Sequence, residues 1–249
     1  MKHLFLIISF LFPALNLLYA QVGEHRTDLA IGGSCGFVTN RISFNPSVKQ
    51  SMKNGVTVGF TARYTCEKYF KMLCAIQGEL NYSQAGWKEK SQTTSANEGE
   101  KTGTYQRTLH YLQLPILANL GFGRERGGVK GFLVVGPQLG FCIGETEKTT
   151  GDGSGYIPYQ LYGRPNQHEI KVQKKFEYGI TGGLGMDVST KKGHHFIIEG
   201  RYFYGLSDIF SNSKKDPFGR SANGTIIAKV SYLFDIKKTP VIKTKGEKE

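Results

Sequence analysis

Apolar and polar residues alternate along eight stretches of this chain, and the links between the stretches are alternately short and long. Alternation with a period of two is typical of a β-strand whose two faces meet different surroundings. The eight predicted strands span Asp28–Val38, Val56–Thr65, Phe70–Ser83, Arg107–Phe122, Val129–Gly144, Phe176–Val188, His194–Tyr204 and Thr225–Phe234.

The lengths of the links indicate how these strands are arranged. Tight links are expected at residues 66–69, 123–128 and 189–193. Long polar links are expected at residues 39–55, 84–106, 145–175 and 205–224. Short turns at one end and long loops at the other are typical of barrels that span an outer membrane. The chain is therefore predicted to be all-β, an eight-stranded antiparallel up-and-down transmembrane β-barrel.

A membrane barrel needs apolar residues on its outer face and small or polar residues inside, and six of the eight predicted strands follow this pattern. The strand 129–144 is apolar on both faces, with Phe132 and Val134 predicted to point inward, and the strand 28–38 is weak. A soluble eight-stranded barrel would need the opposite pattern. In the strand 56–65 the outward set is Val56, Val58, Phe60, Ala62 and Tyr64, and the inward set is Thr57, Gly59, Thr61, Arg63 and Thr65.

Outward aromatic residues gather near both ends of the predicted strands. Amphipathic rings favour the two interfaces of a membrane, so this sorting independently favours a spanning barrel. With odd strands running outward, both termini are expected on the periplasmic side. The short-turn girdle is Tyr64, Phe70, Phe122, Phe196 and Phe234, and the long-loop girdle is Tyr82, Phe141, Tyr178 and Tyr204.

Residues 1–20 have the character of a secretory signal peptide. Lys2 and His3 precede a short apolar run, and Ala20 precedes the expected cleavage site. The run is too short and interrupted for a spanning helix, which needs about 20 apolar residues; an uncleaved anchor is the alternative. The predicted division is a signal peptide at 1–20, the barrel at 21–235 and a Lys-rich periplasmic tail at 236–249.

The chain carries a formal net charge of +12, and 39% of its residues are apolar. Positive charge can indicate nucleic-acid binding, but the lysines lie in the predicted loops and the tail rather than in a recognition helix. No nucleic acid is therefore expected as a partner. A solvated surface is the simplest interpretation, and attraction to anionic lipid headgroups or surface polysaccharide is the functional one.

Four cysteines allow three disulfide pairings, and the sequence does not choose among them. By parity, Cys35, Cys66 and Cys74 would face lipid and Cys142 the lumen. We therefore expect unpaired thiols that fill small sites rather than a disulfide framework.

The inward face of the predicted strands carries charges of both signs. The interior of an eight-stranded barrel is filled by side chains, so passage of sizeable solutes is not expected. Charges in such an interior should pair, because an isolated buried charge is costly. A structural ion network is favoured over a gated proton or ion path. Its predicted members are Arg63, Glu79, Asp187, Glu199, Arg201 and Lys229, and Lys71 also falls on the inward parity.

Four segments resemble the outer-membrane β-barrel domain common in Bacteroidetes, often called PorT-like: Tyr111–Leu117, Gly136–Gly140, Tyr178–Gly185 and Glu199–Ile209. The resemblance spans essentially the whole mature chain and implies the barrel fold. It also implies an alternative function, that of an accessory component of the type IX protein secretion and gliding machinery. One departure from the family is the tail, which continues beyond the last strand at Phe234.

No catalytic residue, cofactor site or metal site is predicted, and the chain is not expected to be an enzyme. His110, Ser207 and Asp208 could approach the outer rim, but a triad is recognised by geometry rather than by order. The pair His194–His195 is expected on a short turn, in solvent. Residues 152–155 lack the acidic ladder of a calcium loop.

The long loops are the expected recognition surface, because rigid scaffolds carry recognition on their loops. Tyrosine interleaved with glycine and polar residues makes adaptable binding surfaces. The expected partners are outer-membrane lipid and, through the loops, a protein or a surface polysaccharide; a monomer is expected. The candidate recognition residues are Tyr156, Tyr159, Tyr162 and Arg164, with His168 nearby.

Overall fold

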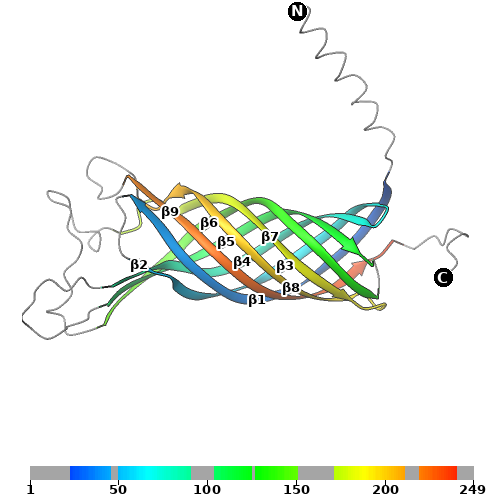
Figure 1. Cartoon of the computed structure of the whole chain (residues 1–249), viewed down its shortest axis with the longest axis horizontal. Coiled ribbons are helices and arrows are strands. Elements are labelled where there is room, and N and C mark those ends of the chain that lie inside the picture. The colour runs from blue at the N-terminus through cyan, green and yellow to red at the C-terminus, as the bar shows by residue number, and fades with distance from the viewer. Residues whose placement is uncertain are drawn as a thin grey trace, which may run out of the picture.

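The computed structural model describes residues 23–45, 50–90, 104–124, 127–150, 171–210 and 219–239. These residues form long, tilted strands around a common axis, as Figure 1 shows. Within these ranges, no helix has the length and hydropathy needed to cross a membrane. The strands are β1 (Glu24–Asn45), β2 (Gln50–Ser51), β3 (Lys53–Tyr69), β4 (Met72–Lys90), β5 (Thr104–Gly123), β6 (Gly128–Thr150), β7 (Phe176–Ser189), β8 (His194–Asp208) and β9 (Arg220–Lys237).

Eight of these strands close into a ring in which every pairing is antiparallel. From β3 onward, each long strand pairs with the next one along the chain; β1 pairs with β3, and the pairing of β1 with β9 closes the circle. The two-residue strand β2 pairs with β4 outside the ring. A closed ring leaves no unpaired strand edge, as a membrane requires. The predicted eight-stranded antiparallel barrel is confirmed.

The strands extend further at the long-loop end than the sequence predicted. Residues 39–45, 84–90, 104–106 and 145–150 were expected in loops, and all four segments are strand. The prediction was wrong there because it ended each strand where apolar residues stop alternating with polar ones. That alternation stops where the strands extend beyond the apolar part of the outer wall. The backbone ladder continues past that point, for example from Tyr82↔Leu112 to Lys90↔Thr104.

The first tight turn was also misplaced. Residues 66–69 continue β3, and the turn is Phe70–Lys71, with Phe70 at a positive φ of 52°. A register shift between Thr65 and Glu67 adds one residue to β3, which the alternating pattern cannot reveal. Lys71 was expected in the lumen, and it is exposed in this turn.

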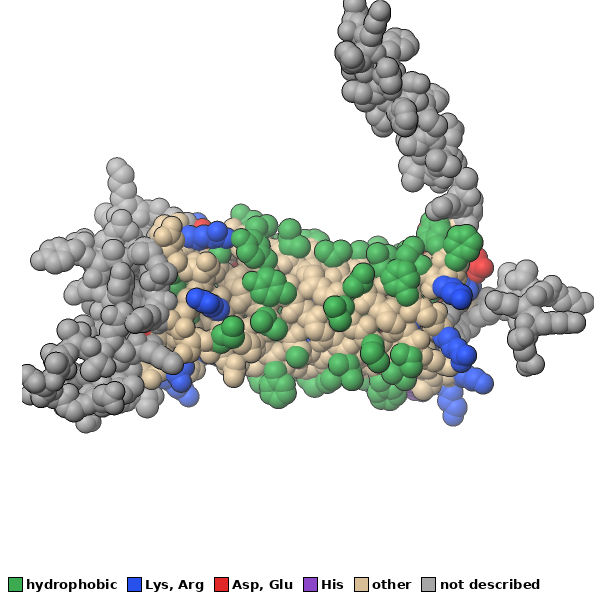
Figure 2. Space-filling view, viewed as in Figure 1, with side chains coloured by type: hydrophobic (Ala, Val, Ile, Leu, Met, Phe, Trp, Pro, Cys, Tyr) green, Lys and Arg blue, Asp and Glu red, His purple; other side chains and the backbone are tan. Residues whose placement is uncertain are grey.

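The two faces of the wall differ as predicted. Outward residues are large and apolar, with Phe60 75% exposed, Leu184 65% and Ile198 67%. Figure 2 shows hydrophobic side chains along the middle of the visible face, and Lys and Arg toward the two ends. The inward residues include buried charged and amide side chains. Phe132 and Val134 point inward as expected.

The cysteines follow the same parity. Cys35 is exposed on the outer wall and Cys142 is buried in the lumen, while Cys66 and Cys74 are partly exposed. All four are free thiols in the structure.

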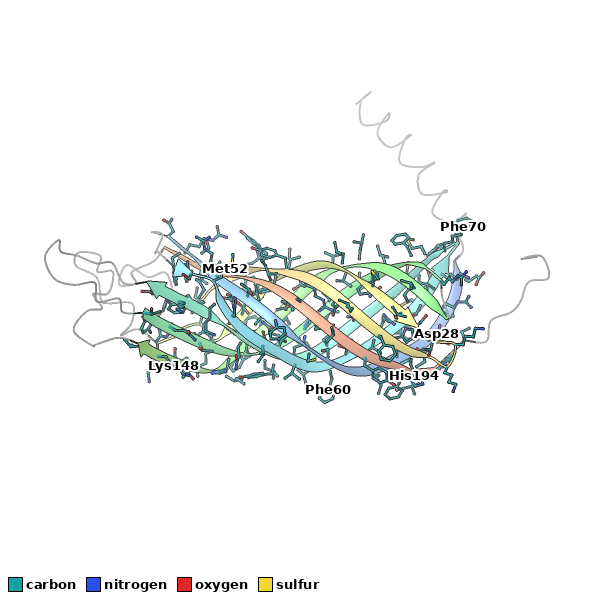
Figure 3. The ribbon with its side chains drawn as sticks, turned by 60° about the horizontal axis from the view of Figure 1, so that its bottom comes forward. Asp28, Met52, Phe60, Phe70, Lys148 and His194 are labelled. Carbon is teal, nitrogen blue, oxygen red and sulfur yellow. The ribbon has the colours of Figure 1, made fainter. Side chains whose placement is uncertain are left out.

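Both ends of the described chain lie at the short-turn end of the barrel (Figure 1). Figure 3 shows Phe70 and His194 near this end, Met52 and Lys148 near the other, and Phe60 projecting from the wall. Eight of the nine predicted girdle residues are exposed or partly exposed on the outer face, and the ninth, Phe70, is exposed in the turn between β3 and β4. Two aromatic belts therefore bracket the apolar wall.

Substitution of Leu184 by Arg tests whether this wall contacts lipid. Leu184 pairs with Gly200, which lies halfway along β8 between the girdle residues Phe196 and Tyr204. An arginine at the middle of a membrane costs about 2–4 kcal/mol and near an interface about 0–1 kcal/mol. We expect Leu184→Arg to lower the free energy of unfolding in lipid vesicles by about the larger amount.

The matched control is Leu206→Arg, because Leu206 is also outward and 49% exposed but lies beyond Tyr204. Its expected loss is within about 1 kcal/mol. Equal losses for the two variants, measured by urea unfolding in vesicles, would contradict a lipid-facing wall.

Candidate functional site

The lumen is organised in layers that can be followed along β8. Its inward residues are, in order from the short-turn end, His195, Ile197, Glu199, Arg201 and Phe203. They belong successively to an ion cluster, an apolar layer, a second ion cluster and the region beneath an aromatic core. All five side chains point inward because every second residue of a strand points to the same face, and their order along β8 gives the order of the layers.

The middle of the lumen holds two carboxylates and two cations. The Arg201 guanidinium donates to Glu79 Oε1 and Oε2 over 2.7 and 2.9 Å, and to both Glu199 oxygens over 2.8 and 2.9 Å. Lys229 Nζ lies 2.7 Å from Glu79 and 3.2 Å from Glu199. These four side chains are almost completely buried and their formal charges cancel. Four of the six residues predicted for the network thus lie together at this level, and we call them the central network.

Amide side chains extend the central network toward β5. Gln77 Nε2 and Asn81 Nδ2 donate to the Glu79 carboxylate over 2.7 and 2.8 Å. Asn119 Nδ2 donates in turn to Gln77 Oε1 over 3.1 Å. The Glu79 carboxylate therefore accepts hydrogen bonds from three strands, which fixes its position across the lumen.

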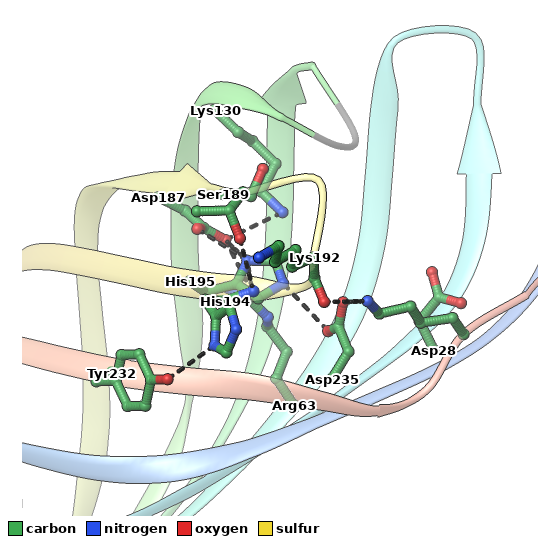
Figure 4. Close-up of polar contacts among 12 residues, drawn as sticks. Asp28, Arg63, Lys130, Asp187, Ser189, Lys192, His194, His195, Tyr232 and Asp235 are labelled. Atoms are coloured by element: carbon green, nitrogen blue, oxygen red, sulfur yellow. Dashed lines mark hydrogen bonds and ion pairs between the residues drawn. The ribbon is translucent and has the colours of Figure 1, made fainter.

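The other two predicted network residues lie in a separate cluster at the short-turn end (Figure 4). Arg63 Nη2 donates to Asp187 Oδ2 over 2.8 Å, and Lys130 Nζ lies 3.3 Å from the same oxygen. His195 lies between two carboxylates, with Nδ1 3.0 Å from Asp187 Oδ1 and Nε2 3.1 Å from Asp235 Oδ1. We call these five residues the short-turn cluster.

The expectation that His195 would be solvated on a turn was wrong. The turn occupies residues 190–193, and β8 begins at His194. Parity then turns His194 outward, where its ring stacks on Tyr232 at 6.0 Å, and turns His195 into the lumen, where it is 7% exposed. The signal that could have placed it is the alternation from Glu199 back through Ile197.

An imidazole between two aspartates could suggest a metal site. Among the described residues, however, no group of three or more His, Cys, Asp or Glu side chains is arranged to hold a metal ion. Lys130 and Arg63 already neutralise Asp187. The arrangement is suited to joining β3, β6, β7, β8 and β9 at the base of the barrel.

An apolar layer separates the two ion clusters. Ile197 lies on β8 between His195 and Glu199, and it packs with buried residues from the opposite wall. Apolar side chains here exclude water from between the two ion clusters, which strengthens the interactions within each. The layer consists of Ala30, Leu117, Phe132, Val134, Ile197 and Leu233.

Above the central network, a row of amides leads to the Glu177 carboxylate. Asn40 Nδ2 donates to Asn223 Oδ1 over 2.6 Å, and Asn223 Nδ2 donates to Glu177 Oε1 over 2.8 Å. Glu177 is 5% exposed, and among the described residues its second oxygen has no hydrogen-bond partner.

The long-loop end of the lumen is closed by an aromatic core that the sequence analysis missed. Trp87 is 1% exposed and donates from Nε1 to Glu89 over 2.6 Å, and the Arg107 guanidinium lies 5.6 Å from the Trp87 ring centre. Arg107 also pairs with Glu145 and Glu147. The core consists of Ile42, Phe44, Ala85, Trp87, Tyr105, Leu109, Tyr111, Cys142, Ile209 and Phe210.

This core was missed because residues 84–106 were assigned to a loop. Several of its members, including Trp87 and Tyr105, lie in that segment, and there they extend the inward parity of β4 and β5. The inward series Asn81, Ser83, Ala85 and Trp87 continues without interruption and was the available signal.

The rim residues considered for catalysis have separate structural partners. His110 lies on β5, with Nδ1 2.6 Å from the Tyr82 hydroxyl, and its ring stacks on Tyr82. Ser207 and Asp208 lie on β8: Ser207 Oγ accepts from the Tyr178 backbone, and Asp208 accepts from the Ser221 backbone. The structure places these three residues on two different strands, each with its own contacts.

The candidate recognition residues Tyr156, Tyr159, Tyr162 and Arg164 lie outside the described residues, as do His168 and residues 152–155. Their role stays a prediction.

Comparison of the sequence with known families matches residues 19–211 to the outer membrane protein beta-barrel domain. A comparison with curated proteins found no match.

Several solved structures match this chain at low identity. The outer membrane protein OprG from Pseudomonas aeruginosa is 10% identical, with 86% of this chain and 98% of that chain covered and a TM-score of 0.43. Neisserial surface protein A is 13% identical, with 82% and 95% covered and a TM-score of 0.37. Ail of Yersinia pestis, in complex with the heparin analogue sucrose octasulfate, is 13% identical, with 83% and 99% covered and a TM-score of 0.35. Similarity at this level carries no information about what this chain binds.

Proposed function

Because the chain belongs to the outer membrane protein β-barrel domain family, we propose that it is a closed outer-membrane barrel of the structural or binding type, whose long-loop end contacts a protein or a surface polymer. In this proposal both termini are periplasmic and the long loops face the exterior. The short turns then lie at the inner interface of the outer membrane.

The observation that carries the proposal is the filled lumen. The central network and the short-turn cluster cross the barrel at two levels, and the aromatic core closes its far end. The cavity beside His195 and Arg63 has a volume of about 30 Å³, which is room for one or two water molecules. A filled lumen of this kind favours binding of a partner at the surface of the barrel over transport of solutes through its interior.

The long-loop end is suited to hold a binding surface. β4, β5 and β6 continue beyond the girdle to Lys90, Thr104 and Thr150, and the aromatic core packs against their inner face. A rigid rim of this kind can present the segments 91–103 and 151–170 without deformation when a partner binds. The lysines at this rim, among them Lys88 and Lys148, favour an anionic partner.

The test is cross-linking of the full-length protein in its own outer membrane, followed by identification of the captured partner. One variant replaces residues 91–103 and 151–170 with short Gly-Ser linkers, and a matched control replaces the periplasmic-side turn 124–127. We expect that the first variant no longer captures the cross-linked partner and that the control variant still captures it. Capture that survives loss of both long segments would overturn it.

The secretion and gliding role implied by the PorT-like resemblance is tested by deletion of the gene. Unchanged protein secretion and motility agree with the binding proposal. If deletion abolishes secretion or motility, and the variant with replaced loops restores it, the loops are not needed for this role. That result would overturn the binding proposal in favour of a role in the export machinery.

A further inference from the structure

A groove of about 470 Å³ lies on the outer wall at the long-loop end, apart from the segments 91–103 and 151–170. It runs along the junction of β1 and β9, where the ring closes. Met52, which lines it, is 57% exposed and lies near this end of the barrel in Figure 3.

The groove exists because β9 presents small residues on its outer face at this level. Ala222 and Gly224 line the floor, between the larger outward residues Arg220 and Ile226. A Cβ placed on Gly224 would come within 3.1 Å of the Tyr202 hydroxyl. A larger residue at 224 would therefore narrow the groove from its floor.

Two arginines provide the only charges among the described residues that line the groove. Arg41 is exposed on β1 opposite Gly224, and Arg220 lies further toward the rim opposite Asn45. Neither arginine forms an ion pair with another residue of the described ranges, and no acidic side chain is part of the lining. The groove thus carries two positive charges that the described barrel does not compensate.

The Arg220 guanidinium is held in place by Tyr204. Its Nη2 donates to the Tyr204 hydroxyl over 2.6 Å, and its Cζ lies 5.9 Å from the Tyr204 ring centre. A guanidinium held by an aromatic ring loses little freedom when it binds an anion, and its planar fork matches the geometry of phosphate.

The opposite end of the groove is apolar and faces the membrane. Ile226 is 51% exposed and is followed on the same face of β9 by Ala228 and Val230. Tyr204 belongs to the aromatic belt, which lies at the level of lipid headgroups. The groove therefore offers cations at headgroup level, and an apolar strip runs from it along the wall toward the hydrocarbon region.

From this arrangement we propose that the groove binds the phosphate-bearing headgroup of a membrane lipid, with the phosphate between Arg41 and Arg220 and an acyl chain along Ile226. Basic pockets at the membrane surface recognise such headgroups. The site is separate from the proposed partner-binding loops and rests only on the barrel spanning the membrane.

The test is native mass spectrometry of the full-length protein in a neutral, phosphate-free detergent, with phosphatidic acid and with diacylglycerol of the same acyl chains. Phosphatidic acid should be retained and diacylglycerol should not. The double variant Arg41→Ala/Arg220→Ala should reduce retention by about tenfold or more, the effect of losing a charge-assisted hydrogen bond. Gly224→Val should also reduce it without a change of charge.

The matched control is Lys174→Ala/Lys175→Ala, which removes two exposed charges from the same rim just before β7. Retention in this control should equal that of the native chain. Equal losses in the control and the arginine variant would overturn the proposal in favour of general charge attraction. Displacement of phosphatidic acid by millimolar inorganic phosphate would overturn it in favour of a free-anion site. Neither of these two outcomes would change the cross-linking result, which tests the proposed function through residues 91–103 and 151–170.

Discussion

Replacement of Arg201 by Met is expected to lower the free energy of unfolding by about 3–5 kcal/mol, the range for breaking a buried ion pair from one side. Arg201 is the common donor to Glu79 and Glu199. Without it, the central network keeps two buried carboxylates and only Lys229 as a cation. The uncompensated charge, rather than the loss of packing, causes most of the expected effect.

The control is a second substitution that restores the charge balance. In Arg201→Met/Glu199→Gln, Glu79 and Lys229 remain as a neutral pair 2.7 Å apart. We expect this double variant to recover about half of the lost stability, because residues of one network are strongly coupled. Urea unfolding can be followed by the single tryptophan, Trp87, which is buried in the aromatic core. A double variant less stable than Arg201→Met would contradict the charge-balance explanation.

Substitution of Asp187 by Asn is expected to have an effect of similar size, about 3–5 kcal/mol. Asp187 is fully buried and contacts Arg63, Lys130 and His195. The carboxamide keeps the volume but removes the negative charge, so positive groups at the base of the lumen lose their common partner. Repulsion among them should loosen β3, β6 and β7 together.

Asp235→Asn provides the comparison, since Asp235 also bonds His195 but its side chain is 12% exposed. Asp235 has fewer charged neighbours than Asp187 and is less buried, so the expected loss is smaller, about 1–2 kcal/mol. The measurement is the temperature at which the folded form disappears from gels of heat-modifiable mobility. Equal shifts for the two aspartate variants would contradict the assigned role of burial at Asp187.

The number of strands, their direction and their two faces could be predicted because each follows from a period of two in side-chain polarity. The six predicted charges are buried in the lumen, and eight of the nine girdle residues lie on the outer face, with Phe70 exposed in a turn. Parity assigns a residue to a face but does not give its height in the barrel. For this reason a single network was predicted, whereas Arg63 and Asp187 form a cluster apart from Glu79 and Arg201.

The predicted strand ends were wrong where the alternation of apolar and polar residues stops before the backbone hydrogen bonding between neighbouring strands stops. Trp87 and Tyr105 were placed in a loop because their outward neighbours are polar, although their own parity is inward. The register shift after Thr65 moved the first turn to Phe70–Lys71. The groove at Arg41 and Arg220 was not predicted because it depends on the pairing of the first strand with the last, which the sequence does not display.

We propose that this outer-membrane barrel is closed and binds its partner at its surface rather than passing solutes through its lumen. Conductance of the purified full-length protein in a planar lipid bilayer tests it most directly, with an open porin in the same bilayer as the positive control. We expect insertion without steady conductance steps, because two ion clusters and an aromatic core fill the lumen. Stable, ohmic steps from the native protein at low voltage would contradict it.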